Sequence, residues 1–131
     1  SQYAQDQSAA VNILIEVNVT RDSRKHGVVP EVLFDFIEQL IKDNLPALSL
    51  RGLMTIGPHA AAEQEIRRCF AKLRELRDEC RKRFALPDFT ELSMGMSGDY
   101  VAAIKEGATM VRVGTAIFGE RDYSRNKYSE Q

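Results

Sequence analysis

The chain has 131 residues, of which 44% are hydrophobic, enough for one compact core and with no sign of two complete domains. Its 18 Lys and Arg balance 19 Asp and Glu, and the net charge of −1 argues against a protein that binds nucleic acid through electrostatics. The sequence lacks an apolar run of the roughly 18 residues that a membrane helix needs, and its polar start, SQYAQDQ, is unlike a signal peptide. We therefore expect a soluble protein of the cytoplasm or of an organelle.

Strand-like and helix-like patterns alternate along the chain. Runs of β-branched and apolar residues predict strands at 12–19, 51–56, 91–95 and 110–113. The first strand is followed by an apolar stripe at helical spacing, which begins near Pro30 and stops before Pro46. A longer helix with one charged face is expected at about 61–84, and its charges are interpreted as a solvated surface.

Two shorter helices are expected near the carboxyl end. The first takes Ser97 as its N-cap, has Asp99 in its first turn to complement the helix dipole, and ends at Gly107. The second follows Gly114. Each predicted strand is thus followed by a helix.

Alternating strands and helices indicate a parallel sheet, either open with helices on both faces or closed as a barrel. The first strand favours the barrel, because one face is apolar and the other carries charge. Ile13, Ile15, Val17 and Val19 face one way, and Leu14, Glu16 and Asn18 face the other. A complete barrel has eight strands and about 250 residues. We expect an α/β fold that is the C-terminal half, strands five to eight, of a (β/α)8 TIM barrel, with the N-terminal half absent. Residues 1–123 would form this partial barrel and residues 124–131 a flexible tail.

The strongest candidate site joins the ends of the last two predicted strands. Ser97 follows one strand, and Gly114 and Thr115 follow the next. Backbone N–H groups at such strand-to-helix junctions bind anions, and barrel enzymes often hold a phosphate after their last two strands. Ser97 and Thr115 add hydroxyl groups, and Gly114 permits close approach. The alternative is that Ser97 is an ordinary N-cap and Gly114 an ordinary turn residue.

Arg112 lies two positions before Gly114 and is expected to point into the barrel, where its charge requires a partner. That partner is either a ligand or a structural ion pair with Glu16 or Asp99. Asn18 and Ser93 are further candidates for the polar interior, and each is equally suited to a structural hydrogen bond.

The remaining reactive side chains show no catalytic or metal-binding pattern. His26 and His59 are interpreted as ordinary loop residues. Cys69 and Cys80 lie eleven apart within the long helix, which fits neither a zinc site nor a disulfide framework, and we expect both to be small core residues.

The segments ELSMGMSGD and GATMVRVGTAIFGERDY, together with SRKHG and RGLMTIG, closely resemble the pyridoxal phosphate homeostasis protein family, also called YggS/PROSC. The resemblance runs from about residue 12 to residue 123. It implies a single-domain fold-type III barrel, like the N-terminal domain of alanine racemase, that binds pyridoxal 5′-phosphate and acts in vitamin B6 homeostasis as a non-catalytic carrier or regulator. Ser97, Gly114 and Thr115 would then bind the phosphate, and Arg112 would face the pyridine nitrogen.

The family's Schiff-base lysine lies on an early barrel strand, upstream of this sequence. None of the chain's lysines is expected at an inward strand position, so we expect the covalent anchor to be absent and the open half-barrel to associate with a missing N-terminal half or with another copy. Two alternatives remain, namely an amino-acid racemase, for which Tyr100 and Tyr123 are poorly placed as the acid/base residue, and a barrel fragment that binds only phosphate.

Overall fold

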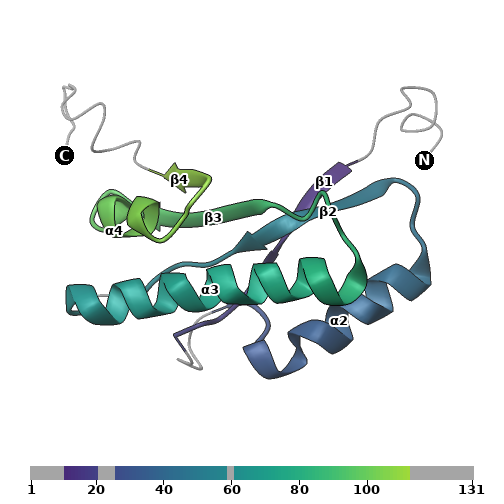
Figure 1. The fold of residues 1–131 in the computed structure, drawn as a ribbon, viewed down its shortest axis with the longest axis horizontal. Helices are drawn as coiled ribbons and strands as arrows, with labels where there is room; N and C mark the ends of the chain where they lie inside the picture. Colours follow the sequence, from purple (N-terminus) through teal and green to yellow (C-terminus); the bar gives the residue numbers. More distant parts are fainter. Residues whose placement is uncertain (1–10, 21–25, 59–60, 113–131) are drawn as a thin grey trace.

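The computed structural model describes residues 11–20, 26–58 and 61–112 (Figure 1). Strands and helices alternate strictly within these residues, as the sequence predicts. In chain order the elements are β1 (Val11–Glu16), α2 (Pro30–Asp43), β2 (Leu48–Met54), α3 (Glu63–Phe84), β3 (Glu91–Met96), α4 (Tyr100–Lys105) and β4 (Met110–Arg112). The predicted fourth helix and its neighbour Gly114 lie outside the described residues.

The four strands form one parallel sheet in the order β1-β2-β3-β4, which is also their order along the chain. Helices α2 and α3 lie against one face of this sheet, and α4 packs beside β3 and contributes to the same core (Figure 1). An open doubly wound sheet reverses its strand order at a switch point and carries helices on both faces. Sequential strands with helices on one face are instead the arrangement of a (β/α) barrel, which confirms the predicted fold class.

A single apolar core joins the sheet to its helices. Leu33 and Ile37 of α2 and Phe70 and Leu73 of α3 are fully buried, and so is Leu92 of β3. The two long helices also meet directly, because the rings of Phe34 and Phe84 lie 6.4 Å apart. These buried side chains are spaced three or four residues apart on each helix, which is why the apolar stripes could be located in the sequence.

Strands β2 and β3 approach each other unusually closely at Gly52. A Cβ atom on this residue would lie 2.0 Å from the carbonyl oxygen of Glu91, so only glycine fits there. Close by, the register between β1 and β2 shifts between Ile13 and Leu14, which face Leu50 and Gly52. Strand β2 begins at Leu48, three residues before the strand that the sequence predicts.

The opposite face of the sheet mixes polar and apolar side chains and carries a row of residues, one from each strand. The strand register aligns Glu16 with Met54, Met54 with Ser93, and Ser93 with Met110. No helix in the described part of the chain covers this face (Figure 1). In a closed barrel the same face lines the interior.

Candidate functional site

The candidate site begins where β3 ends and the chain turns into α4. Asp99 closes this turn: its Oδ1 accepts a hydrogen bond of 2.6 Å from the N–H of Met96, and its own N–H donates to the Met96 carbonyl oxygen at 3.1 Å. Gly95 lets α4 come close, because a Cβ atom there would lie 2.6 Å from Cβ of Ala103. Hydrogen bonds between Met96 and Asp99 therefore hold the turn in place.

The prediction that Ser97 is the N-cap of this helix is wrong. Helix α4 starts at Tyr100, and Asp99 occupies the N-cap position without a side-chain hydrogen bond to the helix. Both residue types are good N-caps, so the sequence could not decide between them. The carboxylate of Asp99 accepts a hydrogen bond from Met96, which precedes the helix. The N-cap position is therefore two residues later than predicted, and Ser97 lies at the apex of the turn.

Ser97 is exposed, and its hydrogen-bond donors have no partner among the described residues. Among the described residues, none accepts a hydrogen bond from the Ser97 hydroxyl or from the N–H groups of Ser97 and Gly98. These donors lie at the carboxyl end of a parallel sheet, where α/β proteins usually bind ligands. The turn therefore holds hydrogen-bond donors that bond to no described residue, and its binding of an anion stays a prediction.

A hollow of about 430 Å³ opens beside this turn. Its volume is within the range typical of small-molecule pockets, about 300–1,000 Å³. The walls come from the end of β2, the start of α3 and the turn after β3. The lining residues are Ile56, Gly57, Pro58, Ala61, Ile66, Met96, Ser97, Gly98 and Asp99.

Arg112 lies beside the same turn, because it pairs with Met96 in the register between β4 and β3. Its side chain is exposed and forms no ion pair with Glu16 or Asp99, so neither structural partner considered for it is found. The sequence predicted that this side chain points into a closed barrel, where its charge would require a partner. The face on which it was expected to be buried is open when four strands are present, and β4 is an edge strand.

The other two predicted phosphate ligands, Gly114 and Thr115, lie outside the described residues. In sequence, Ser97 is one residue beyond Met96, and Gly114 is two residues beyond Arg112. The described structure thus holds Ser97 and Arg112 at adjacent strand ends and leaves the rest of the predicted cluster untested.

An ionic cluster at the end of α4 was not anticipated from the sequence. The Glu106 side chain is only 11% exposed, and it accepts hydrogen bonds of 2.7 Å from Nε of Arg67 and from Nη1 of Arg74. Bonds from the two arginines hold the pKa of this carboxyl below its ordinary value. Arg67 and Arg74 were interpreted as part of a solvated face, but they attach α4 to α3 and so support the turn that carries Ser97.

The cysteines and the described histidine show no reactive arrangement. Cys80 is fully buried, as expected, and burial raises the pKa of its thiol to about 12. Cys69 is only half-buried, and burial likewise raises the pKa of its thiol. His26 is exposed, and His59 lies outside the described part of the chain. No group of three or more possible metal ligands occurs among the described residues.

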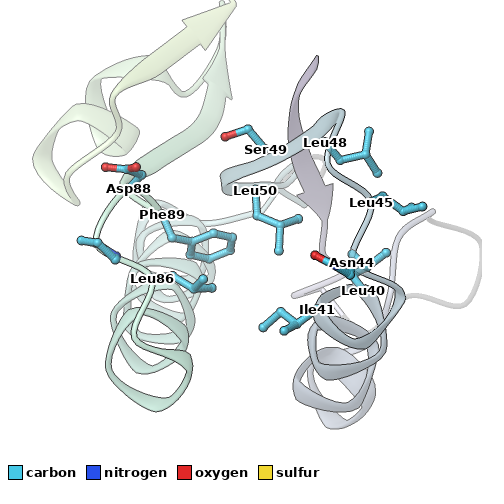
Figure 2. Close-up of a pocket in the computed structure, with 11 residues that line it drawn as sticks. Leu40, Ile41, Asn44, Leu45, Leu48, Ser49, Leu50, Leu86, Asp88 and Phe89 are labelled. Atoms are coloured by element: carbon cyan, nitrogen blue, oxygen red, sulfur yellow. The ribbon is translucent and has the colours of Figure 1, made fainter. Parts of the chain in front are cut away.

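A second hollow, of about 330 Å³, lies at the opposite end of the sheet and is largely apolar (Figure 2). Leu40 and Ile41 of α2 form one wall, Leu86 and Phe89 the other, and Leu50 of β2 lies between them. Its polar groups come from Asn44, Ser49 and Asp88. Barrel enzymes have their active sites at the other end, where the carboxyl ends of the strands meet, so this hollow is not the candidate site.

Four lysines are described, and all are exposed on helices rather than strands: Lys42, Lys72, Lys82 and Lys105. For these four the structure confirms that none occupies an inward strand position. Lys25 and Lys127 lie outside the described residues.

Comparisons with known proteins agree with the fold. The chain is 49% identical over 114 residues to the pyridoxal phosphate homeostasis protein of Aquifex aeolicus, covering 86% of this chain and 48% of that protein. It is 39% identical over 117 residues to the human protein of the same name, covering 88% and 42%. The chain therefore spans about half the length of these curated relatives.

A solved structure of PipY from Synechococcus elongatus, with pyridoxal phosphate bound, matches with a TM-score of 0.77 and 34% identity, over 90% of this chain and 53% of PipY. The structure of PipY without the cofactor matches with a TM-score of 0.78. None of the described helices is both long and apolar enough to cross a membrane. The model of the family described as alanine racemase, N-terminal domain, matches residues 1–122. Because that match covers nearly the whole chain, this protein belongs to the alanine racemase N-terminal domain family.

Proposed function

We propose that this chain supplies the phosphate-binding side of a pyridoxal 5′-phosphate site and acts in vitamin B6 homeostasis as a carrier or regulator rather than as an enzyme. The observation that carries the proposal is the set of donors on Ser97 and Gly98 that bond to no described residue, beside Arg112, at the carboxyl end of the sheet. The relatives named as pyridoxal phosphate homeostasis proteins, and PipY with its bound cofactor, support it.

The donors of the turn suit a phosphate. A hydroxyl and two backbone N–H groups can each donate to a phosphate oxygen, and hydrogen bonds to a charged acceptor are the strong ones. The carboxylate of Asp99 is nearby, and its Oδ1 accepts a hydrogen bond from the Met96 N–H at 2.6 Å, so this oxygen is held by the backbone of the turn. Gly114 and Thr115 complete the proposed phosphate site.

Arg112 is proposed to donate a hydrogen bond to the pyridine nitrogen. Bound pyridoxal phosphate supplies an aldehyde that reacts with amines and a ring that withdraws electrons most strongly when its nitrogen is protonated. A guanidinium stays charged and cannot accept that proton, so Arg112 keeps the ring nitrogen unprotonated. This arrangement suits a carrier, because it weakens the ring as an electron sink.

The covalent anchor of the cofactor is proposed to come from a lysine outside this chain. The four described lysines lie on helices, so none is placed to reach the face of the sheet opposite the helices from a strand. The chain on its own should therefore bind the cofactor reversibly and through its phosphate.

Calorimetric titration of the chain with pyridoxal 5′-phosphate and with pyridoxal tests this proposal. The expected result is binding of the phosphorylated compound at least tenfold tighter than binding of pyridoxal. Equal affinity for both compounds, or no binding of either, would refute a phosphate site.

Arg112→Gln separates ring recognition from phosphate recognition. It should weaken binding of pyridoxal 5′-phosphate several-fold while leaving that of inorganic phosphate nearly unchanged. Arg68→Gln is the matched control, because Arg68 is an exposed arginine on α3. Equal effects of both substitutions would show that Arg112 contributes only general positive charge.

A further inference from the structure

The carboxylate of Asp99 lies between two of the loops that border the hollow beside Ser97. On one side, its Oδ1 accepts the hydrogen bond of 2.6 Å from the N–H of Met96, at the end of β3. On the other side, its Oδ2 lies against Gly57 in the loop after β2, because a Cβ atom built on Gly57 would lie 3.3 Å from this oxygen. One side chain is thus packed against both loops.

The hydrogen bonds between Met96 and Asp99 are reciprocal. The N–H of Asp99 donates to the carbonyl oxygen of Met96 at 3.1 Å, and the carboxylate of Asp99 accepts the N–H of Met96. The acid of a capping box accepts the N–H three positions before it in the same way. Roughly a third to a half of tight turns lack the backbone bond that closes them. The carboxylate therefore supplies a second bond that keeps this turn closed.

The carboxylate is not needed to start α4. The side chain of Asp99 makes no capping hydrogen bond to that helix. The backbone carbonyl of Asp99 serves the helix instead, since it accepts the N–H of Ala103 at 3.1 Å. The two functions are therefore separate: the backbone of Asp99 begins the helix, and its side chain holds the turn.

Ser97 and Gly98 are the two central residues of this turn. Both closing bonds join Met96 to Asp99, so neither bond uses the N–H of Ser97 or of Gly98. The direction of these two N–H groups is set by the conformation of the turn. Donors that are already ordered bind a ligand more tightly, because the cost of ordering them is not subtracted from the binding free energy.

We propose that Asp99 is the positioning residue of the phosphate site, holding the donors of Ser97 and Gly98 in the conformation that binds the phosphate. The carboxylate acts through the turn and does not itself contact the ligand. Gly57 keeps the carboxylate in place from the loop after β2. This inference rests on the proposed function, because it assigns a role within that same site.

The space at Gly57 explains how this loop reaches the turn. A Cβ atom on Gly57 would lie 3.2 Å from two ring atoms of Phe70, as well as 3.3 Å from Oδ2 of Asp99. Both contacts are tight. The ring of Phe70 is fully buried and closely packed, whereas Asp99 is only half-buried, so the carboxylate is the group that can move. A larger residue at Gly57 should therefore disturb the turn through Asp99.

Calorimetric titration of three variants tests the role of the carboxylate. Asp99→Ala should weaken binding of pyridoxal 5′-phosphate by about tenfold or more, because it removes one of the two bonds that hold the turn. Asp99→Asn should restore the affinity to within about threefold of wild type, since its amide oxygen accepts the same bond. Binding of pyridoxal, which has no phosphate, should change little in either variant. Asp88→Ala, at an exposed acid beside the opposite end of the sheet, is the matched control.

The outcomes separate this inference from the function on which it rests. Equal binding of pyridoxal 5′-phosphate and pyridoxal by the wild type would refute both. Selective binding of the phosphorylated compound that Asp99→Ala leaves unchanged would refute the positioning role alone. A loss in Asp99→Asn as large as that in Asp99→Ala would also contradict it, because the effect would then come from the charge and not from the accepted hydrogen bond.

Hydrogen exchange observes the turn without any ligand. The amide of Met96 should exchange about tenfold or more faster in Asp99→Ala than in wild type, while the amide of Leu73 in α3 should keep its rate. Unchanged exchange at Met96 would overturn the proposal, because the carboxylate would then not hold the turn.

A double-mutant cycle tests the link to Gly57 and does not depend on the stability of one variant. Gly57→Ala should weaken binding of pyridoxal 5′-phosphate several-fold in the wild type and should add no further loss in Asp99→Ala, because the two residues act through one carboxylate. Losses that add in the double variant would show that Gly57 acts independently of Asp99, which would overturn the proposed coupling.

Discussion

The carboxylate of Glu106, just after α4, lies 2.7 Å from the guanidinium of Arg74 on α3. Arg74 also donates to the Glu106 carbonyl oxygen at 2.9 Å, and Arg67 binds the second carboxylate oxygen. Since α4 has only six residues, this cluster, rather than helix propensity, fixes its position. The turn that carries Ser97 precedes α4 directly, so the cluster supports the candidate site from outside it.

Glu106→Gln should lower the free energy of unfolding by about 1–3 kcal/mol, because charge-assisted hydrogen bonds to a mostly buried carboxylate are lost. Chemical denaturation measures this difference. Glu79→Gln is the matched control: its pair with Arg83 is about half exposed on both sides, and removing it should cost about 0.5 kcal/mol or less. Equal losses for the two variants would contradict the role given to Glu106.

The same cluster predicts how stability depends on pH. The two arginines lower the pKa of Glu106 in the folded state, so the unfolded chain takes up its proton at a higher pH than the folded chain does. The stabilisation is therefore fully present above the unfolded value, about 4.3, and is lost as the pH falls through the folded value. The difference in unfolding free energy between wild type and Glu106→Gln should shrink below about pH 4.3. A difference that stays constant from pH 6 to pH 3 would contradict this.

Ala85→Gly should stabilise the protein by about 0.5–1 kcal/mol. Ala85 caps the end of α3 in a left-handed conformation, with φ of 53°, where its Cβ atom is strained and glycine is not. Thermal unfolding should show a higher midpoint for the variant. Ala71→Gly, within the same helix, should lower it, which controls for the flexibility that glycine adds to the unfolded chain.

The two thiols should differ in reactivity. Cys80 is fully buried with a pKa raised to about 12, so an alkylating reagent near pH 8 should not modify it in the folded protein. Cys69 is half-buried with a raised pKa, and it should react slowly. Mass mapping of alkylated peptides measures both rates, and rapid modification of Cys80 would show that the helix opens readily.

The sequence predicted the fold well because the fold depends on local periodicity. The stripe that includes Leu33 and Ile37 and the alternation around Ile15 identify a helix and a strand without any knowledge of tertiary contacts. Element boundaries were less predictable. The start of α4 depended on which of Ser97 and Asp99 caps the helix, and a hydrogen bond from Met96 decided it.

Features that arise from contacts between distant segments were missed. Arg67 and Glu106 are 39 positions apart, and nothing in the spacing of charges on α3 identifies the arginines that bind this carboxylate. The exposure of Arg112 could not be predicted either, because it depends on what lies against the face of the sheet opposite the helices. Ser97, in contrast, was identified correctly as a residue at a strand end, although its capping role was wrong.

The most direct test of the proposed phosphate site compares two serine substitutions at opposite ends of the sheet. Ser97→Ala should weaken binding of pyridoxal 5′-phosphate to the chain by about ten- to a hundred-fold, the loss expected for one hydrogen bond to a charged group. Ser49→Ala, at the apolar hollow of Figure 2, should leave the affinity unchanged. Equal affinities for wild type and both variants would contradict the central claim that the turn at Ser97 holds the phosphate.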